Sequence, residues 1–218
     1  MARNKYPEET VQLILDTAQR LFLEKGYDNT TIQDIVDQLG GLTKGAVYHH
    51  FKSKEAILSA VSDRLFYQNN PFDVVKDRTD LNGLQKLRAV ARAHQSDTDS
   101  TNLTIQQLSI APNPELLVDM IVSNRQILTP YYQAILEEGN RDGSIHTDYP
   151  RELAELMPIL SSLWLIPSLF PATKEQAKRK MLFMGDMLEK MGVPFFDEEM
   201  LRVVDEYFEQ IPDSIYEN

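Results

Sequence analysis

The stretch TTIQDIVDQLGGLTKGAVYHHFKSKE, residues 30–55, decides the fold of this chain. Either threonine at its start can cap a helix, and Thr30 with Gln33 has the spacing of a capping box. The apolar side chains that follow recur every three or four residues, as on one face of a helix. The glycine pair at 40–41 ends this helix, and Thr43 is placed to cap the next one. The stretch is therefore expected to form two short helices joined by a tight turn.

The second of these helices, predicted over residues 44–50, has an apolar and a polar face. Val47 and Phe51 lie four residues apart and should both face inward. Two short helices, a tight turn and outward polar residues on the second helix are typical of a helix-turn-helix. In that motif the second helix enters a DNA major groove about 12 Å wide. The polar side chains left to face outward are those of Lys44, Tyr48 and His49.

Further helices are expected on both sides of this motif. Residues 7–25 carry a helical apolar stripe, and Ser53 can cap a helix over 54–67. Pro130 should kink or split the long segment 115–138. No period-two strand pattern, internal repeat or low-complexity tract is present, so the chain is predicted to be all-α. The other expected helices are 83–94, 101–110, 151–168, 174–191 and 198–210.

The charge is unevenly distributed along the 218 residues. The formal net charge is −11, which by itself disfavours binding to phosphates. Residues 1–60, however, hold seven basic and eight acidic side chains, so nearly all of the excess acidity lies in the remainder of the chain. A nearly neutral DNA-contacting region attached to an acidic body fits this distribution.

Several functional classes lack their sequence signals. There is no cysteine, and no Ser/His/Asp order, glycine-rich phosphate loop or metal-ligand spacing, so neither an enzyme nor a metal or cofactor site is expected. No apolar run is long enough for a membrane helix or a signal peptide. These features favour a cytoplasmic protein with no membrane partner.

Residues 12–61 closely resemble the DNA-binding domain of the TetR family of transcriptional regulators. The resemblance rests on motifs that occur in the same order over about 50 residues, which makes it more specific than a single short motif. One departure is the turn Leu39-Gly40-Gly41-Leu42-Thr43, which is one residue longer than is usual in the family. The motifs are Ile14-Leu15-Asp16-Thr17-Ala18, Leu21-Phe22, Gly26-Tyr27, Thr30-Thr31-Ile32, Asp34-Ile35-Val36, residues 44–51 (KGAVYHHF) and Lys54-Glu55.

The resemblance implies which residues contact DNA. In the family, the DNA backbone is commonly contacted from the start of the second helix, from the recognition helix and from the start of the fourth helix. Base contacts usually come from the second helix and the first turn of the third. The implied backbone contacts are Thr31, Lys44, Tyr48 and Lys54. The implied base contacts are Gln33, Thr43, Gly45, Ala46 and His49.

The resemblance also implies the role of the rest of the chain. Residues 1–62 would form the three-helix helix-turn-helix DNA-binding domain, and residues 63–218 a helical dimerisation and effector-binding domain. Helices 151–168 and 174–191 would pair across a two-fold axis in a homodimer. The protein would then be a ligand-responsive repressor of a palindromic operator in double-stranded DNA, although the sequence identifies neither the small-molecule effector nor its ligand-binding residues.

Two alternatives remain at this point. The acidic charge also fits a helical interaction protein that has kept the helix-turn-helix without reading DNA. The apolar side chains of residues 151–168 and 174–191 could equally build the core of a monomer.

Overall fold

The computed structural model describes residues 7–108 and 114–217, and the chain divides into two compact units, Met1–Gln68 and Asn69–Asn218. Regular structure within the described ranges is helical throughout, so the predicted all-α class is confirmed. The end of the predicted helix 101–110 and the beginning of the chain lie outside the described residues.

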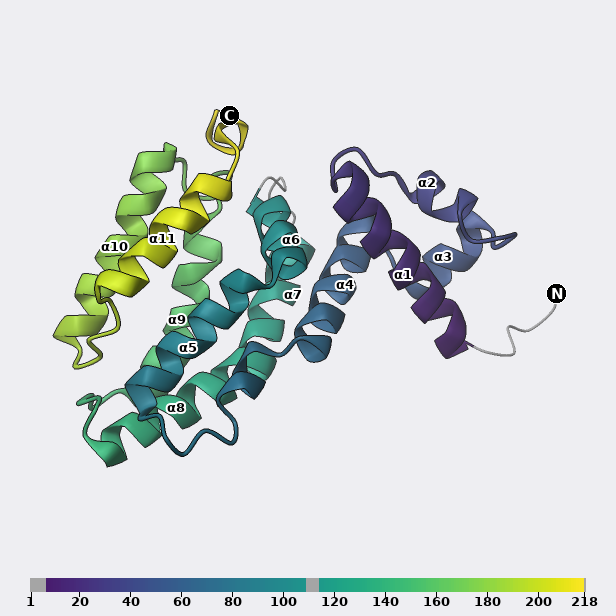
Figure 1. The fold of residues 1–218 in the computed structure, drawn as a ribbon. Helices are drawn as coiled ribbons and strands as arrows, with labels where there is room; N and C mark the ends of the chain where they lie inside the picture. The colour runs from purple at the N-terminus through teal and green to yellow at the C-terminus, as the bar shows by residue number, and fades with distance from the viewer. Residues whose placement is uncertain (1–6, 109–113, 218) are drawn as a thin grey trace. The chain divides into compact units, whose positions relative to one another are not determined.

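The first unit is built from helices that cross one another (Figure 1). They are α1 (Pro7–Lys25), α2 (Ile32–Asp37), α3 (Lys44–His50) and α4 (Lys54–Gln68). Here α1 contacts α4 and α2, and α2 contacts α3. The predicted apolar stripe of α1 faces the core, because burying one face of an amphipathic helix stabilises it far more than its intrinsic propensity does. The large core side chains of this unit are Ile14, Leu15, Leu21, Phe22, Ile35, Val47, Ile57, Leu58, Val61 and Leu65.

The helix α2 is capped one residue later than the sequence spacing suggests. The Thr31 hydroxyl accepts the N–H of Asp34 at 3.1 Å, and the Asp34 carboxylate accepts the N–H of Thr31 at 2.7 Å. The expected capping box of Thr30 and Gln33 is therefore wrong. Thr30 is buried, and its hydroxyl donates to the carbonyl oxygen of Gly26 at 2.8 Å. Burial against the end of α1 thus decides which of the two adjacent threonines is free to cap.

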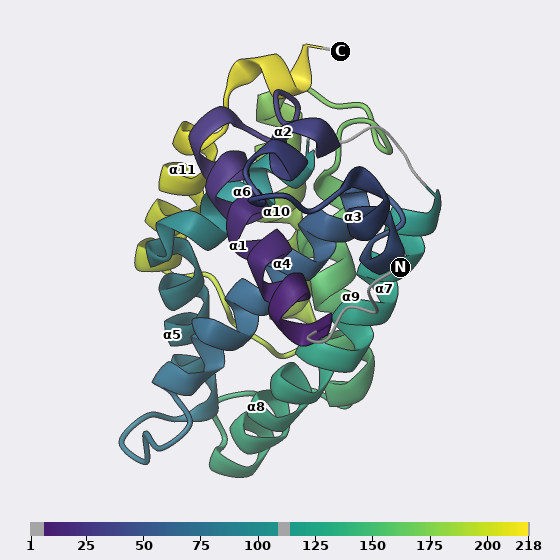
Figure 2. The same cartoon turned by 90° about the vertical axis from the view of Figure 1, so that its right-hand side faces the viewer.

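The second unit contains the remaining helices (Figures 1 and 2). Both views place α11 next to α10, and α11 also contacts α5. The helices are α5 (Gly83–Ser96), α6 (Thr98–Leu108), α7 (Pro114–Ser123), α8 (Thr129–Asp142), α9 (Pro150–Ser161), α10 (Lys174–Lys190) and α11 (Glu198–Gln210). The short turns are η1 (Pro71–Val74), η2 (Asn124–Leu128), η3 (Leu163–Leu165) and η4 (Asp213–Tyr216).

The predicted helix 115–138 is interrupted just before Pro130, where the helical hydrogen-bond pattern changes from α to π and back while the backbone stays helical. Helix α7 ends at Ser123, the π-helical turn η2 follows, and α8 begins at Thr129 with Pro130 in its first turn. Proline has no N–H to donate to the preceding turn, so the start of a helix is where it costs least.

The predicted helix 151–168 is too long. Helix α9 ends at Ser161, and Ile166 has an extended backbone with φ −70° and ψ 114°. The residue before a proline is disfavoured in the helical region, and Pro167 follows Ile166 directly. The Ser162 hydroxyl also donates to the carbonyl oxygen of Pro158 at 2.6 Å, which satisfies a carbonyl at the helix end. The Ser162 hydrogen bond and Pro167 therefore end the helix, although the apolar periodicity of the sequence continues beyond Ser161.

Helices α5 and α8 meet at two glycines. A Cβ atom added to Gly83 would lie 2.4 Å from the Cα atom of Gly139, which is closer than atoms can approach. The first turn of α5 is also bound to the end of α8, since the Gly83 N–H donates to the Asp142 carboxylate at 2.7 Å. The Leu84 N–H donates to the Ser144 hydroxyl at 3.1 Å. The packing of the second unit therefore depends on this close contact of the two backbones.

We expect Gly83→Ala to lower the free energy of unfolding by about 1–3 kcal/mol, the usual cost of forcing extra atoms into a packed interior. Helix propensity alone would predict the opposite sign, since alanine favours helices over glycine by about 1 kcal/mol. Urea unfolding followed by circular dichroism would measure the difference. The control is Asn102→Ala at an exposed position of α6, for which a change within about 0.5 kcal/mol is expected. A Gly83→Ala protein as stable as the wild type would contradict the close contact.

Candidate nucleic-acid interface

The turn between α2 and α3 is built from two glycines. Gly40 has φ +60° and Gly41 has φ +107°, both in the left-handed region that residues with a Cβ rarely adopt. Apart from each glycine and its two chain neighbours, no heavy atom lies within 4 Å of the position a Cβ would take. The two glycines are therefore needed for the backbone conformation and not for space. They let α3 follow α2 closely in spite of the additional turn residue.

The start of α3 is capped as the sequence predicts. The Thr43 hydroxyl accepts the N–H of Ala46 at 3.2 Å. The cap satisfies one of the free N–H groups of the first turn, and the others remain able to meet an anion such as a phosphate. Ser53 is confirmed in the same role for α4, since its hydroxyl accepts the N–H of Ala56 at 3.2 Å.

The faces of α3 are set by Val47, which is wholly buried. With Val47 directed into the core, Lys44 and Tyr48 are exposed, and Tyr48 keeps 46% of its surface accessible. The Lys44 ammonium lies 5.9 Å from the centre of the Tyr48 ring, so the two side chains share one side of the helix. Phe51, expected to face fully inward, is only half-buried because it is the residue that ends α3 with an extended backbone.

The ammonium of Lys54 is held inside the first unit. It donates to the carbonyl oxygens of Tyr27 at 2.8 Å and Thr30 at 2.9 Å, and it lies 3.9 Å from the centre of the Tyr27 ring. Burial lowers the pKa of Lys54. Lys54 therefore joins the start of α4 to the segment that precedes α2. Of its three N–H donors, these bonds use two.

Glu55 completes this junction. The Tyr27 hydroxyl donates to the Glu55 carboxylate at 2.9 Å. Burial, together with Glu55, raises the pKa of the Tyr27 phenol well above its ordinary range. Burial of Glu55 acts to raise its own pKa, but hydrogen bonds from its backbone N–H, Ser53 and Tyr27 outweigh it and leave the pKa lowered. The junction is thus a network of charge-assisted hydrogen bonds between the loop that follows α1 and the first turn of α4.

The structure places the predicted site residues at the N-cap of α2, in α2 and α3, in the turn between them and at the start of α4. Gln33 bonds within its own helix, its amide donating to the Asp37 carboxylate at 2.8 Å. Ala46 and Lys54 are half-buried, and the exposed members are Thr31, Gln33, Thr43, Lys44, Gly45, Tyr48 and His49. Sequence reasoning left out one exposed basic residue beside this set, Lys52, in the loop between α3 and α4.

Other kinds of site find no support in the described part of the chain. There, no three His, Asp or Glu side chains lie close enough together to hold a metal ion. The adjacent rings of His49 and His50 contact each other edge-on, with centroids 5.1 Å apart. Among the described helices, none combines the length and the apolar character needed to cross a bilayer.

Two family models match the chain. Residues 14–61 match the bacterial regulatory proteins of the tetR family, and residues 98–186 match a tetracyclin repressor-like C-terminal domain. The first match covers α2 and α3 and parts of α1 and α4, where the candidate interface lies.

Curated relatives extend the likeness beyond the interface. The chain is 30% identical over 149 residues to the HTH-type transcriptional repressor KstR2 of Rhodococcus jostii, covering 65% of this chain and 70% of that repressor. It is 52% identical over 50 residues to the HTH-type transcriptional regulator YerO of Bacillus subtilis, covering 23% of this chain and 17% of YerO. The KstR2 match thus extends well beyond the first unit.

Solved structures share the fold. A TetR-family regulator from Pectobacterium atrosepticum has a TM-score of 0.60 at 20% identity, covering 88% of this chain and 98% of that one. FadR of Bacillus subtilis in complex with stearoyl-CoA has a TM-score of 0.55 at 20% identity, covering 92% of this chain and 96% of that one. On the two family models and the KstR2 match, the chain belongs to the TetR family of DNA-binding transcriptional regulators.

Proposed function

We propose that this protein is a homodimeric repressor that binds a palindromic operator and is released from it by a small molecule. The observation that carries the proposal is the solvent-facing side of α3, where Lys44 and Tyr48 are exposed opposite the buried Val47. A dimer follows from DNA geometry, because one recognition helix reads few bases and two can read half-sites one helical turn apart. Repression is supported by the name of the KstR2 relative.

We further propose a division of labour within the interface. Thr31, Lys44, Tyr48 and Lys54 would position the protein on the DNA backbone, since phosphate contacts fix register without reading sequence. The free backbone N–H groups at the starts of α2 and α3 would also donate to DNA phosphates. Residues proposed to face bases are Gln33, Thr43, Gly45, Ala46 and His49.

The proposed dimer contact lies on α9, α10 and the segment between them. The Phe183 side chain is 56% exposed and contacts the edge of the Trp164 ring, with centroids 5.9 Å apart. Lys180 joins α10 to the intervening segment by donating to the carbonyl oxygens of Trp164 at 3.2 Å and Phe170 at 3.1 Å. Exposed apolar side chains on adjoining elements are typical of a protein contact. The exposed members are Leu156, Ile159, Phe170, Leu182 and Phe183.

The proposed effector shifts the equilibrium between dimers that can bind DNA and dimers that cannot. A ligand that binds the DNA-incompetent dimer more tightly than the competent one lowers operator affinity without touching the interface. Support comes from the FadR relative, whose structure contains stearoyl-CoA. For this chain, the effector site is proposed to lie in the second unit.

Lys44→Ala and Tyr48→Ala are each expected to weaken operator binding by at least about tenfold, since each removes a phosphate contact. For Lys44→Ala the dependence of log affinity on log salt should also fall by about one. Fluorescence anisotropy against duplex DNA from upstream of the protein's own gene, with competitor DNA, measures both quantities. Lys76→Ala, at an exposed lysine of the second unit, is the control and should bind as the wild type does. Tolerance of both substitutions would indicate an interaction protein that does not read DNA.

Lys54→Met is expected to lower the free energy of unfolding by about 1–3 kcal/mol, because the carbonyl oxygens of Tyr27 and Thr30 lose a charged donor. It should weaken DNA binding as well. Lys44→Met serves as the matched control, with weaker DNA binding at unchanged stability. Thermal unfolding and anisotropy on the same preparations separate the two effects. Equal stability of the two variants would argue against the structural role of Lys54.

Phe183→Glu is expected to convert a dimer into a monomer at micromolar concentration, because the contact would bury an unpaired carboxylate. Operator affinity should fall by more than about tenfold, since a monomer engages a single half-site. Size-exclusion chromatography with light scattering gives the mass. Leu201→Glu, at an exposed leucine of α11, is the matched control and should remain dimeric. A wild-type monomer, or a dimeric Phe183→Glu variant, would refute this contact.

A further inference from the structure

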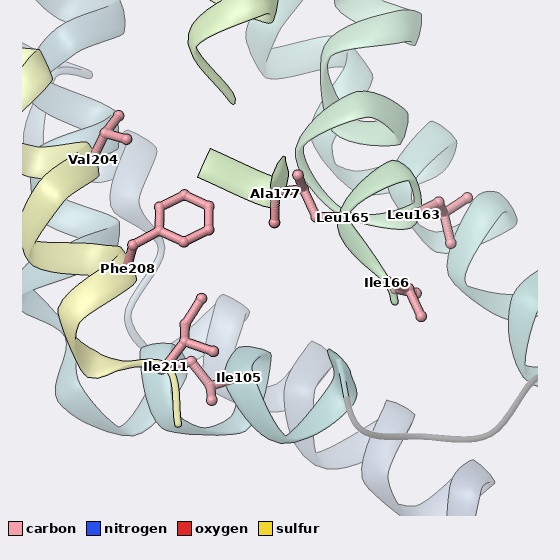
Figure 3. Close-up of a cluster of buried hydrophobic side chains, with 8 residues drawn as sticks. All are labelled: Ile105, Leu163, Leu165, Ile166, Ala177, Val204, Phe208 and Ile211. Carbon is pink, nitrogen blue, oxygen red and sulfur yellow. The ribbon is translucent and has the colours of Figure 1, made fainter. Parts of the chain in front are cut away.

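The two units of the chain join their helices by different kinds of contact. In the second unit, Phe208 points from α11 toward Ala177 within a cluster of apolar side chains (Figure 3). Contacts of this kind hold helices together without removing a charge from water. In the first unit, the charged side chain of Lys54 joins the start of α4 to the loop that follows α1. Partly burying a charge is costly, so the use of a lysine here points to a function besides stability.

The Lys54 ammonium lies over the ring of Tyr27. The centre of the ring is 3.9 Å from the ammonium nitrogen, and the Tyr27 carbonyl oxygen accepts a hydrogen bond from the same group at 2.8 Å. Tyr27 thus supplies two contacts to the ammonium, and the Thr30 carbonyl oxygen supplies another at 2.9 Å. An aromatic face attracts a cation, more strongly where water is excluded.

Tyr27 is itself fixed by the core of the first unit. Its side chain is buried, and its ring packs against that of Phe22, with the centroids 5.5 Å apart. Its hydroxyl donates to the carboxylate of Glu55, the residue that follows Lys54 in α4. Its carbonyl oxygen also accepts the N–H of Thr30 at 3.1 Å. The ring therefore has a fixed position, and so has the ammonium in contact with it.

The Lys54 ammonium is ordered before any ligand binds. A mobile lysine side chain loses rotamer entropy on binding, and a side chain that is already ordered loses less. Burial lowers the pKa of Lys54, but the carboxylates of Asp28 and Glu55 act in the opposite direction and favour the charged form. Lys44 differs, because it is exposed and its ammonium lies 5.9 Å from the centre of the Tyr48 ring. Of the two lysines proposed to contact the DNA backbone, Lys54 is the one held in a hydrogen-bond network.

This ammonium also lies beside another of the proposed DNA contacts. Thr30, whose carbonyl oxygen accepts from Lys54, directly precedes Thr31 in the chain. Lys54 is only half-buried, so part of its side chain stays accessible. Its fixed charge and the Thr31 side chain can therefore meet the same stretch of DNA backbone.

We propose that Tyr27 is a positioning residue for DNA binding, which fixes the Lys54 ammonium where it meets a phosphate of the DNA backbone. This inference rests on the proposed function, because it requires Lys54 to contact DNA. Tyr27 raises the affinity through Lys54 and reads no sequence, since phosphate contacts are available on every duplex. The effect is therefore expected on mixed-sequence DNA as well as on the operator.

The test is a double-mutant cycle on the whole chain. Tyr27→Leu removes the ring and keeps the backbone carbonyl, Lys54→Met removes the ammonium, and a third protein carries both substitutions. Binding to a mixed-sequence duplex is measured by fluorescence anisotropy between about 50 and 200 mM salt. Alone, Tyr27→Leu should weaken binding about three- to tenfold, because the loss is limited by the energy with which the ring holds the ammonium. Added to Lys54→Met, it should weaken binding by less than about twofold.

The salt dependence separates positioning from contact. Lys54→Met should lower the slope of log affinity against log salt by about one, because one phosphate is no longer neutralised. Tyr27→Leu should leave this slope unchanged, because Lys54 still brings its charge to the DNA. A general loss of folding would not produce this pair of results.

Further variants separate positioning from folding. Tyr27→Phe keeps the ring but loses the hydroxyl that donates to Glu55, so it should lower the melting temperature and yet restore most of the affinity that Tyr27→Leu loses. Tyr67→Leu, at an exposed tyrosine of α4, is the matched control and should change neither quantity. Tyr27→Met, whose flexible side chain fills the same space, takes the place of Tyr27→Leu in the cycle if the latter does not fold.

Several results would overturn the proposal. They are an unchanged affinity of Tyr27→Leu, an equal loss with and without Lys54→Met, a salt slope that falls in Tyr27→Leu, and a Tyr27→Phe protein that binds as weakly as Tyr27→Leu. Sequence selectivity is measured separately, by selection from random duplexes. A protein that shows the expected coupling on the mixed-sequence duplex but selects no sequence would refute the proposed repressor and leave the role of Tyr27 standing.

Discussion

Burial of the Val47 side chain is the constraint on which the candidate interface depends. Helix α3 has seven residues, and isolated helices shorter than about 12–15 residues are marginal in water. The helix therefore persists because tertiary burial holds it, with Thr43 capping its first turn. The same contact determines which side chains face solvent, since fixing one side of a helix fixes the opposite side. Folding of the first unit and presentation of the interface are consequently one event.

Sequence reasoning succeeded where the determinants are local. Caps formed by Thr43 and Ser53, and the interruption of the helix near Pro130, depend on residues within one or two turns, and the structure confirms all three. It failed where distant burial decides. Nothing in the order Thr30-Thr31 reveals which hydroxyl packs against the end of α1. The prediction for 151–168 failed for a different reason, since the local signals of Ser162 and Pro167 were outweighed by the apolar periodicity.

The candidate site shows the same limit. Exposure of Lys44 and Tyr48 follows from helical spacing once Val47 is taken as buried. Lys54, by contrast, bonds to carbonyl oxygens 24 and 27 residues away in the chain, and its sequence neighbourhood gives no sign of them. Two lysines that look alike in sequence thus have different environments, one open to solvent and one inside a hydrogen-bond network.

The glycine contact between α5 and α8 has a consequence for how this sequence can diverge. A side chain gained at Gly83 would meet the backbone of Gly139, and Gly139 is already the smallest residue. No second substitution on α8 can therefore make room, unlike a core position, where a large neighbour can shrink to accommodate a larger one. Substitutions can therefore accumulate among the side chains around the crossing of α5 and α8, but a substitution at Gly83 itself would not be neutral.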